Sequence, residues 1–299
     1  MNFLKKIKNY FGDSKLCQNI TSYLSGEVTI FCYHKVTNLK ADKLAGTPDE
    51  DLSINIEIFE NQIKYLSNNF NIIDPFELMD IEKLKSTKEK KVLITFDDGY
   101  MDNLENALPI LKKYKTNAII FITTNFIDDN ETPWWDLLWE IITKKDIFIL
   151  DSKKINTSEN FKDKKKIFEY LKSKFFLLKR KEQTDLIKKI FYENKIQFPP
   201  KTKGRFLNKE NIKYLSKENH IYIGAHTHYH QNLGVLNDSE TQEEISSSKK
   251  ILEDLTQTSI NFFAYPYGTK SSYKKSDYKI LKDNNFKLAF TTEFNNYKL

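Results

Sequence analysis

The chain has 299 residues and a formal charge of +6, from 47 Lys and Arg against 41 Asp and Glu. This excess is mild and almost entirely lysine, which argues against bidentate phosphate recognition by arginine and against nucleic-acid binding. Two cysteines, Cys17 and Cys32, do not make a disulfide framework. The chain shows no internal repeat and no Pro/Gly/Ser linker, so its length favours one large α/β domain over residues 27–299.

Residues 1–26 precede the first predicted strand, and residues 1–11 are basic and amphipathic. We expect an ordinary first helix here, with peripheral contact to a membrane surface as the alternative. The segment lacks the apolar core and the small-residue cleavage site of a signal peptide, and no run is long enough to span a bilayer. A cytoplasmic location is therefore expected, with the inner face of the membrane as a second possibility.

Seven apolar, β-branched runs alternate with helical patterns, which predicts a parallel sheet covered by helices. The strands are expected to end near His34, Asp74, Phe96, Thr123, Ala225, Ala264 and Thr291. Helices are expected at residues 56–68, 103–115, 208–217 and 239–255.

Residues 128–204 interrupt this alternation and predict an insertion that forms a helical lid or flank. It holds all three tryptophans, including Trp134 and Trp135, and Lys-rich helical segments follow at about 161–178 and 182–194. We expect the tryptophans to pack the insertion onto the domain, because large aromatic side chains usually supply core contact area. Stacking on a ring of the substrate is the alternative.

Two adjacent carboxylates, Asp97 and Asp98, follow the predicted strand at residues 91–96 and precede Gly99. Like charges this close raise the pKa of one of them, so folding both into a strand end is costly. A bound metal removes that cost for one carboxylate, and the other is then free to act as a base. A turn or a helix cap is the structural alternative, but it explains one aspartate better than two.

Three of the five histidines lie in residues 226–230, directly after an apolar run that predicts a buried strand. Neutral imidazole is the commonest metal ligand, and two histidines four residues apart can reach one ion. Taken alone, the stretch fits a metal site and a solvated loop about equally well. A catalytic ion also needs an anionic ligand, which Asp97 or Asp98 can supply.

A third predicted strand is followed by Pro266, Tyr267 and Gly268. The chain has only eight glycines, and Gly99, Gly224 and Gly268 each lie in or beside one of these three strand ends. Glycine permits backbone conformations and close approaches that other residues resist. Because the carboxyl ends of parallel strands meet at one edge, the three loops predict one convergent site.

The three strand ends carry TFDDG at residues 95–99, HTHYH at 226–230 and FAYPYG at 263–268. In this order they resemble the first three motifs of the polysaccharide deacetylases, which form carbohydrate esterase family 4 and share the NodB-homology domain. The resemblance spans roughly residues 28–292. It implies the distorted (β/α)7 barrel of that family, with the helical insertion added.

The resemblance implies a role for each matching residue. Asp98, His226 and His230 would hold a divalent metal, usually zinc in this family, although the ligand set also accepts Co2+, Ni2+ or Fe2+. Asp97 would be the general base that activates water, and the backbone N–H of Tyr267 would help to bind the oxyanion.

Other residues of the motifs would support the loops or touch the substrate. Thr227 would brace the histidine loop by hydrogen bonding, Gly99 and Pro266 would shape their turns, and His228 would not be a ligand. Weaker candidates for substrate contacts are Tyr100, Tyr265, Trp134 and Trp135.

One departure from the family concerns the general acid, usually a histidine in a late motif, because no histidine follows His230 here. His34 is the expected substitute. It lies in a YHKV run that resembles the Y-H-x-V element near the start of one branch, which includes poly-N-acetylglucosamine deacetylases. A buried histidine bonded to the backbone is the alternative.

A second departure lies in the third motif, where Ala264 stands at a position at which many members carry an arginine that tethers the base. The two arginines of the chain, Arg180 and Arg205, lie outside the motifs. Asp97 is therefore expected either to be oriented by another group or to be a less well-tuned base.

The sequence thus predicts a metal-dependent hydrolase that removes N-acetyl groups from an N-acetylated sugar or polysaccharide in surface glycan metabolism. A hydrolase of another amide or of an O-acetyl ester is the first alternative, and a non-catalytic glycan-binding protein is the second. The base Asp97 argues against the second, because a binding module has no need of it. In the cytoplasm, the substrate would be a nucleotide-linked or lipid-linked sugar precursor.

Overall fold

The structure is a computed structural model that describes residues 28–39, 48–80, 82, 84, 89–145, 147–150, 153–156, 161–199 and 203–293. The helix expected within residues 1–26, together with Cys17, lies outside the described residues. Among the helices that are described, none combines the length and the apolar character needed to cross a membrane.

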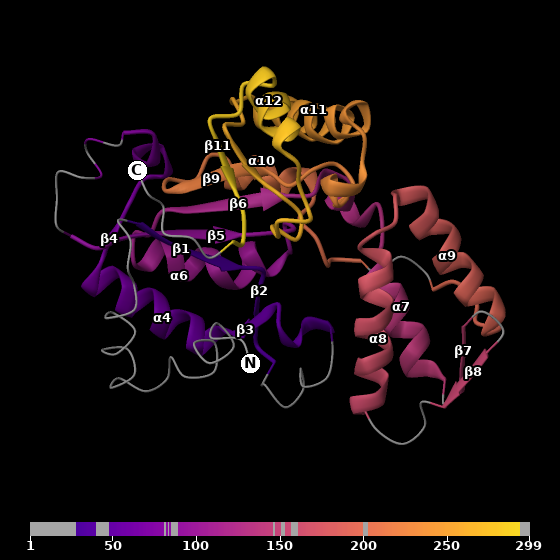
Figure 1. Ribbon diagram of the computed structural model, residues 1–299. Helices are drawn as coiled ribbons and strands as arrows, with labels where there is room; N and C mark the ends of the chain where they lie inside the picture. Colours follow the sequence, from indigo (N-terminus) through magenta and orange to yellow (C-terminus); the bar gives the residue numbers. More distant parts are fainter. Residues whose placement is uncertain are drawn as a thin grey trace.

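A parallel sheet forms the centre of the molecule (Figure 1). Its strands in the described chain are β1 (Val28–Tyr33), β4 (Asn71–Ile72), β5 (Lys91–Phe96), β6 (Ala118–Ile122), β9 (Ile221–Ala225), β10 (Phe262–Ala264) and β11 (Leu288–Phe290). They run in the order β1-β5-β6-β9-β10-β11, with β4 also paired to β5. All seven predicted strand ends are confirmed to within two residues.

Two inner strands, β5 and β6, contribute most clearly to the buried core of the sheet. β5 and β6 are buried at every position, as expected for parallel strands that are covered on both faces. Within the described strands no pairing joins β1 to β11, so the barrel stays open at that seam. The α/β class and the distorted barrel predicted from the sequence are confirmed.

Helices cover the sheet on both sides, with α4 and α6 below the central strands and α11 and α12 above them in Figure 1. Their bounds are α4 (Ile56–Asn69), α6 (Leu108–Lys113), α10 (Lys209–Leu215), α11 (Asp238–Thr256) and α12 (Lys275–Asp283). A π-helical turn, η3 (Asn103–Ala107), leads directly into α6. The four helices predicted around the sheet are confirmed, with the second beginning as this π-helical turn.

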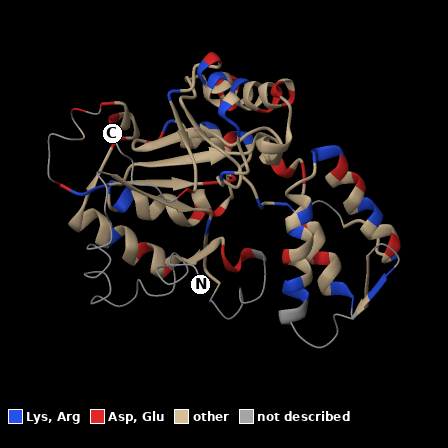
Figure 2. Cartoon of the chain, viewed as in Figure 1, with Lys and Arg blue, Asp and Glu red and all other residues tan. Residues whose placement is uncertain are grey.

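The segment predicted as an insertion contains a helical lobe beside the sheet, seen at the right of Figure 1. It consists of α7 (Trp134–Lys144), the hairpin β7 (Ile147–Leu150) and β8 (Lys153–Asn156), α8 (Phe161–Phe175) and α9 (Arg180–Glu193). The lobe has its own apolar cluster, with Leu138, Phe148 and Ile190 fully buried. Basic and acidic residues alternate along its helices in Figure 2, so the lysines form a mixed, solvated surface.

Several elements with weak local sequence patterns were not predicted. These are α7, α12, the β7–β8 hairpin and the short parallel pair β2 (Lys35–Thr37) and β3 (Ser53–Asn55). Three- and four-residue strands are too short to show a clear alternation of apolar and polar residues. The tryptophan-rich run that forms α7 has an apolar pattern that fits a helix and a buried strand equally well.

Candidate metal and catalytic site

Three strand ends meet at one edge of the sheet and carry the predicted site residues. β5 pairs with β6, β6 with β9, and β9 with β10, all in parallel. The loops that follow β5, β9 and β10 therefore leave the sheet at the same edge, although they lie far apart in sequence.

Asp98, His226 and His230 form a compact, buried cluster at this edge. Asp98 Oδ1 lies 3.6 Å from His226 Nε2 and 3.2 Å from His230 Nε2. The three side chains are 4%, 2% and 9% exposed. Asp98 Oδ1 makes no well-aligned hydrogen bond in the described structure, and a buried carboxylate oxygen is costly without a compensating partner. One carboxylate and two imidazoles in this arrangement fit a divalent metal ion.

The electrostatics of the cluster favour its metal-binding protonation states. Burial alone would raise the pKa of Asp98, but the nearby histidines, His230 foremost, hold it below its usual range. Burial lowers the pKa of His226, so its ring is neutral at neutral pH. His226 Nδ1 lies 2.8 Å from the carbonyl oxygen of Ala264, which fixes the tautomer that leaves the Nε2 lone pair free for a metal.

Four non-glycine residues of the three loops that follow β5, β9 and β10 adopt a left-handed backbone conformation. Such residues cost free energy and cluster where function requires a special geometry. The β-branched Thr227 is the least expected of them. The φ values are 74° for Asp98, 62° for Thr227, 56° for His230 and 64° for Tyr267.

Glycine is required at two of the turns. Gly99 and Gly268 have φ values of 76° and 62°. A Cβ on Gly268 would also lie 2.5 Å from the backbone nitrogen of Thr292. Gly99 is therefore required by its positive φ. Gly268 is required both by its positive φ and because its backbone lies close to that of Thr292.

Asp97 lies beside the metal cluster and has two close partners, Cys32 in β1 and His34 directly after it. Its Oδ2 accepts a hydrogen bond from the thiol of Cys32 at 3.2 Å, and His34 Nε2 lies 4.0 Å from the same oxygen. The backbone N–H of Asp97 donates to the carbonyl of Tyr33 at 3.0 Å. Cys32 is thus a group that orients Asp97 where the family arginine is replaced by Ala264, and the sequence reading missed it.

His34 has an exposed side and a fixed backbone. Its side chain is 26% exposed, and its carbonyl oxygen accepts a hydrogen bond from the buried Asn103 Nδ2 at 2.8 Å. Asn103 opens the π-helical turn, a feature often found at functional sites. The structure therefore brings His34 next to Asp97, with its ring available to a ligand.

The third loop presents a backbone donor. No group in the described part of the chain accepts a hydrogen bond from the Tyr267 N–H, whereas the Tyr267 carbonyl accepts one from Thr292 Oγ1 at 3.1 Å. Pro266 is buried just before it. The Tyr267 ring lies 4.9 Å from the His230 ring, so this loop borders the metal cluster.

The lobe reaches the metal cluster through Trp135. Its ring lies 5.1 Å from the ring of His230 in an edge-to-face arrangement, and only 8% of the residue is exposed. Trp134 stacks on Phe175 at 4.6 Å. Trp135 therefore packs the lobe against the site and Trp134 packs within the lobe, in line with the packing role favoured from the sequence.

Two other candidate substrate contacts present little surface. Tyr100 is 1% exposed and stacks on Phe206 at 4.9 Å. Tyr265 is 2% exposed and lies in the main core, 4.8 Å from the Tyr273 ring. Neither side chain is open to a substrate in this structure.

Truncating Trp135 is expected to damage the metal site as well as the fold. Trp135→Ala should lower the free energy of unfolding by about 3–5 kcal/mol, since it leaves a cavity between the lobe and His230. It should also weaken metal binding by about tenfold or more, because an outer-shell support of a ligand is lost. Chemical denaturation and metal titration measure the two effects. Trp139→Ala on the same helix, where Trp139 packs on Phe168, is the control; equal metal affinities in both variants would contradict the prediction.

Glu244 holds the histidine loop and was not found from the sequence. Its Oε2 accepts hydrogen bonds from the backbone N–H groups of His228 and Tyr229 at 3.0 and 2.9 Å. Burial raises the pKa of this carboxyl to about 7. The Thr227 carbonyl accepts a hydrogen bond from the Thr124 N–H at 3.2 Å, so Thr227 supports the histidine loop through its backbone.

His228 faces away from the metal cluster. Its Nδ1 lies 2.8 Å from Thr124 Oγ1, and it is not part of the ligand group. This placement agrees with the expectation that His228 is not a ligand.

Glu244→Ala is expected to lower the free energy of unfolding by about 2–4 kcal/mol, because two partly buried N–H groups lose their acceptor. Glu244→Gln should retain both hydrogen bonds.

The raised pKa of Glu244 means that the native state disfavours the charged carboxylate. The contribution of Glu244 to the free energy of unfolding is therefore most favourable below pH 4.5 and is lost as the pH rises to about 7. In the metal-free protein, the free energy of unfolding of Glu244→Gln relative to the wild type should therefore rise by up to about 3 kcal/mol between pH 5 and pH 8. Denaturation at both pH values checks this, and a constant difference would contradict it.

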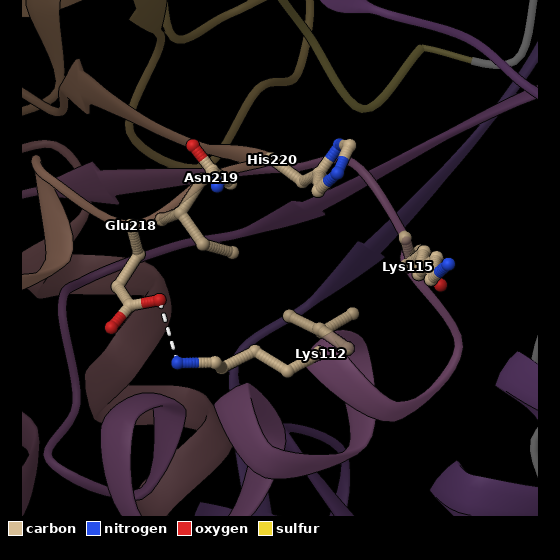
Figure 3. A pocket seen from close by; sticks show the side chains of 8 residues that line it. Lys112, Lys115, Glu218, Asn219 and His220 are labelled. Atoms are coloured by element: carbon tan, nitrogen blue, oxygen red, sulfur yellow. Dashed lines mark hydrogen bonds and ion pairs between the residues drawn. The ribbon is translucent and has the colours of Figure 1, made fainter.

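Figure 3 shows a hollow that is separate from this site. It lies at the amino ends of β6 and β9, where Thr116 and His220 precede these strands, whereas the metal cluster follows their carboxyl ends. An ion pair of 2.7 Å between Lys112 and Glu218 spans part of it. His220 Nδ1 is bonded to Asn117 Oδ1 at 2.8 Å, so this histidine belongs to the opposite edge of the sheet.

Comparison with known proteins agrees with the motifs. The family profile described as Polysaccharide deacetylase matches residues 84–150 and 164–289. The chain is 46% identical to YxkH of Bacillus subtilis over 66 residues, which is 21% of this chain and 24% of YxkH. It is 33% identical over 99 residues to the poly-beta-1,6-N-acetyl-D-glucosamine N-deacetylase of Staphylococcus aureus, covering 33% of each protein. These alignments therefore span a third or less of the curated relatives.

Solved structures share the fold over most of the chain. IcaB from Ammonifex degensii has a TM-score of 0.54 and 17% sequence identity, covering 89% of this chain and 84% of IcaB. The Streptococcus pyogenes deacetylase PplD, solved with acetate, has a TM-score of 0.51 and 19% identity, covering 89% of this chain and 83% of PplD. At these identities the likeness concerns the fold.

Proposed function

The chain belongs to the polysaccharide deacetylase family, and on this premise we propose that it hydrolyses N-acetyl groups of an N-acetylated sugar or glycan in surface glycan metabolism. One observation carries the proposal: the buried ligand set of Asp98, His226 and His230 lies directly beside a second carboxylate, Asp97. A binding module has no use for that second carboxylate, whereas hydrolysis of an amide needs a base next to a metal.

Asp98, His226 and His230 would hold a divalent ion, with Zn2+ proposed and Co2+, Ni2+ or Fe2+ as other ions that this donor set accepts. When bound, such an ion supplies a Lewis acid that polarises the acetamide carbonyl and lowers the pKa of a water molecule to about 7. Burial lowers the pKa of His226 and so favours its neutral form, and the Ala264 carbonyl fixes the tautomer that leaves Nε2 free for the ion.

The remaining residues divide the proton transfers between them. Asp97 takes a proton from a water molecule as the water oxygen attacks the carbonyl carbon. The thiol of Cys32 holds the Asp97 carboxylate in place through its hydrogen bond. The Tyr267 N–H donates to the carbonyl oxygen as negative charge develops on it. His34 then donates a proton to the leaving nitrogen as the C–N bond breaks, which yields acetate and the free amine.

Release of acetate tests the proposal. The metal-loaded and the chelator-stripped protein would be assayed with N-acetylglucosamine oligomers and with an O-acetylated sugar. Release from the N-acetylated sugar only when metal is bound supports the proposal. Release from the O-acetyl ester alone would favour an esterase, and binding of the oligomer without any release by the metal-loaded protein would identify a glycan-binding protein.

His34→Ala is expected to lower turnover by about a hundredfold or more, because general acid catalysis typically contributes 10²–10⁴-fold. The one equivalent of metal held by Asp98, His226 and His230 should stay bound, since His34 is not among these buried ligands. Steady-state kinetics and metal analysis measure the two quantities, with His220→Ala at the opposite edge of the sheet as the control. Full turnover in His34→Ala would remove this residue as the acid.

A further inference from the structure

We propose that Cys32, His34 and Asp97 form a second, inhibitory metal site beside the first. One potential ligand atom from each residue lies within 4.8 Å of the other two. Asp97 Oδ2 is 3.2 Å from Cys32 Sγ and 4.0 Å from His34 Nε2. Sulfur, nitrogen and oxygen donors at this spacing can close on one ion with small side-chain movements.

The backbone places the three donors without strain. Cys32 and His34 are two residues apart at the end of β1, and residues two apart on an extended chain face the same side. Tyr33 lies opposite Phe96 in the parallel pair β1–β5, and the Asp97 N–H donates to the Tyr33 carbonyl at 3.0 Å. The frame that carries the donors is therefore rigid, and only their side chains need to adjust.

The donor types select the ion. A thiolate, an imidazole and a carboxylate suit Zn2+, Co2+ or Cd2+ better than Mg2+ or Ca2+, which prefer oxygen ligands. Binding would release the thiol proton of Cys32 to solvent and would change no oxidation state. The group of Asp98, His226 and His230 contains no sulfur, so the two sites differ in the spectrum of a bound ion.

Access differs between the two groups as well. Cys32 is exposed and the His34 side chain is 26% exposed, whereas the side chains of the first group are all at most 9% exposed. Solvent can thus deliver a second ion to Cys32 and His34 while the buried group keeps the first.

Occupancy of the second site would stop turnover. It would engage the carboxylate oxygen of Asp97 and the Nε2 atom of His34, the two atoms assigned above to proton transfer. This consequence rests on the proposed function, whereas the site itself rests only on the three donors. One equivalent of Zn2+ is therefore expected to activate the protein, and an excess to inhibit it.

A cobalt titration of the metal-free protein tests the site without any assay of activity. The first equivalent should give visible d–d absorption alone. The second should add the near-ultraviolet band of a thiolate–cobalt bond. Cys32→Ser should lose this band and retain the first equivalent, which also reports that the variant is folded. Cys17→Ser, the matched control, should keep the band.

Zinc inhibition gives the second readout. Cys32→Ser should raise the Zn2+ concentration needed for half inhibition by about tenfold or more, since losing a direct ligand costs at least as much as losing an outer-shell support. The absence of a thiolate band at any Co2+ concentration, its persistence in Cys32→Ser, or its loss in Cys17→Ser would each overturn the proposal. A protein that deacetylates nothing but shows the band would refute the proposed function and leave this site standing.

Discussion

Asp97→Asn is expected to retain the bound metal and to lower kcat by at least about a hundredfold, because an amide cannot take a proton from water. Asn is close to Asp in shape, and its carbonyl oxygen can still accept from the Cys32 thiol, so the fold should be unaffected. Metal analysis of the purified variant and steady-state kinetics measure the two effects.

The informative control is a neutral change of an aspartate elsewhere. Asp254→Asn, on the exposed face of α11 where Asp254 pairs with Lys250, should leave both metal content and kcat at wild-type values. An Asp97→Asn protein with wild-type kcat would show that Asp97 is not the base. Loss of the first equivalent of metal in that variant would instead make Asp97 a ligand of the buried site of Asp98, His226 and His230.

Removing a ligand is expected to abolish both metal binding and activity. In the wild type, metal at about a thousand times its Kd should stabilise the native state by about 4 kcal/mol, because it binds the folded chain alone. His226→Ala and Asp98→Asn should show no such increase in the free energy of unfolding, and their activity should match that of chelator-treated wild type. Thermal unfolding with and without added Zn2+ measures the effect.

His228→Ala provides the matched control, since it lies in the same loop but is bonded to Thr124 and lies outside the cluster. Its native state should still be stabilised by metal to nearly the wild-type extent. An equal loss of stabilisation in His226→Ala and His228→Ala would show that the loop, and not a defined ligand set, determines metal binding.

The candidate ligands could be predicted from the sequence because each depends on local features. Asp98 lies two residues after a strand that is buried throughout, and His226 directly follows another strand. Parallel strands bring such ends together at one edge whatever their order in the sheet, so the cluster did not require knowledge of the pairing. The bulky side chains that support it could not be predicted in this way, because their partners are distant.

Cys32 illustrates the difference most clearly. Its thiol reaches Asp97 across 65 positions of the chain only because β1 pairs with β5 in one particular register. A shift by one residue would turn Cys32 and His34 to the other face of the sheet. No local pattern around Cys32 predicts this contact. The sequence showed only that the arginine is missing, so that either another group orients Asp97 or the base is less well tuned.

The sequence by itself determined the α/β class, the strand ends and the residue types of the site, because periodicity, turn residues and ligand chemistry are short-range properties. Tertiary structure decided which groups surround those residues. It placed Glu244 under the histidine loop, Trp135 against His230, and the thiol of Cys32 on Asp97. These contacts follow from strand register and from the docking of the helical lobe, which depend on the packing of the whole chain and are not encoded in any single segment.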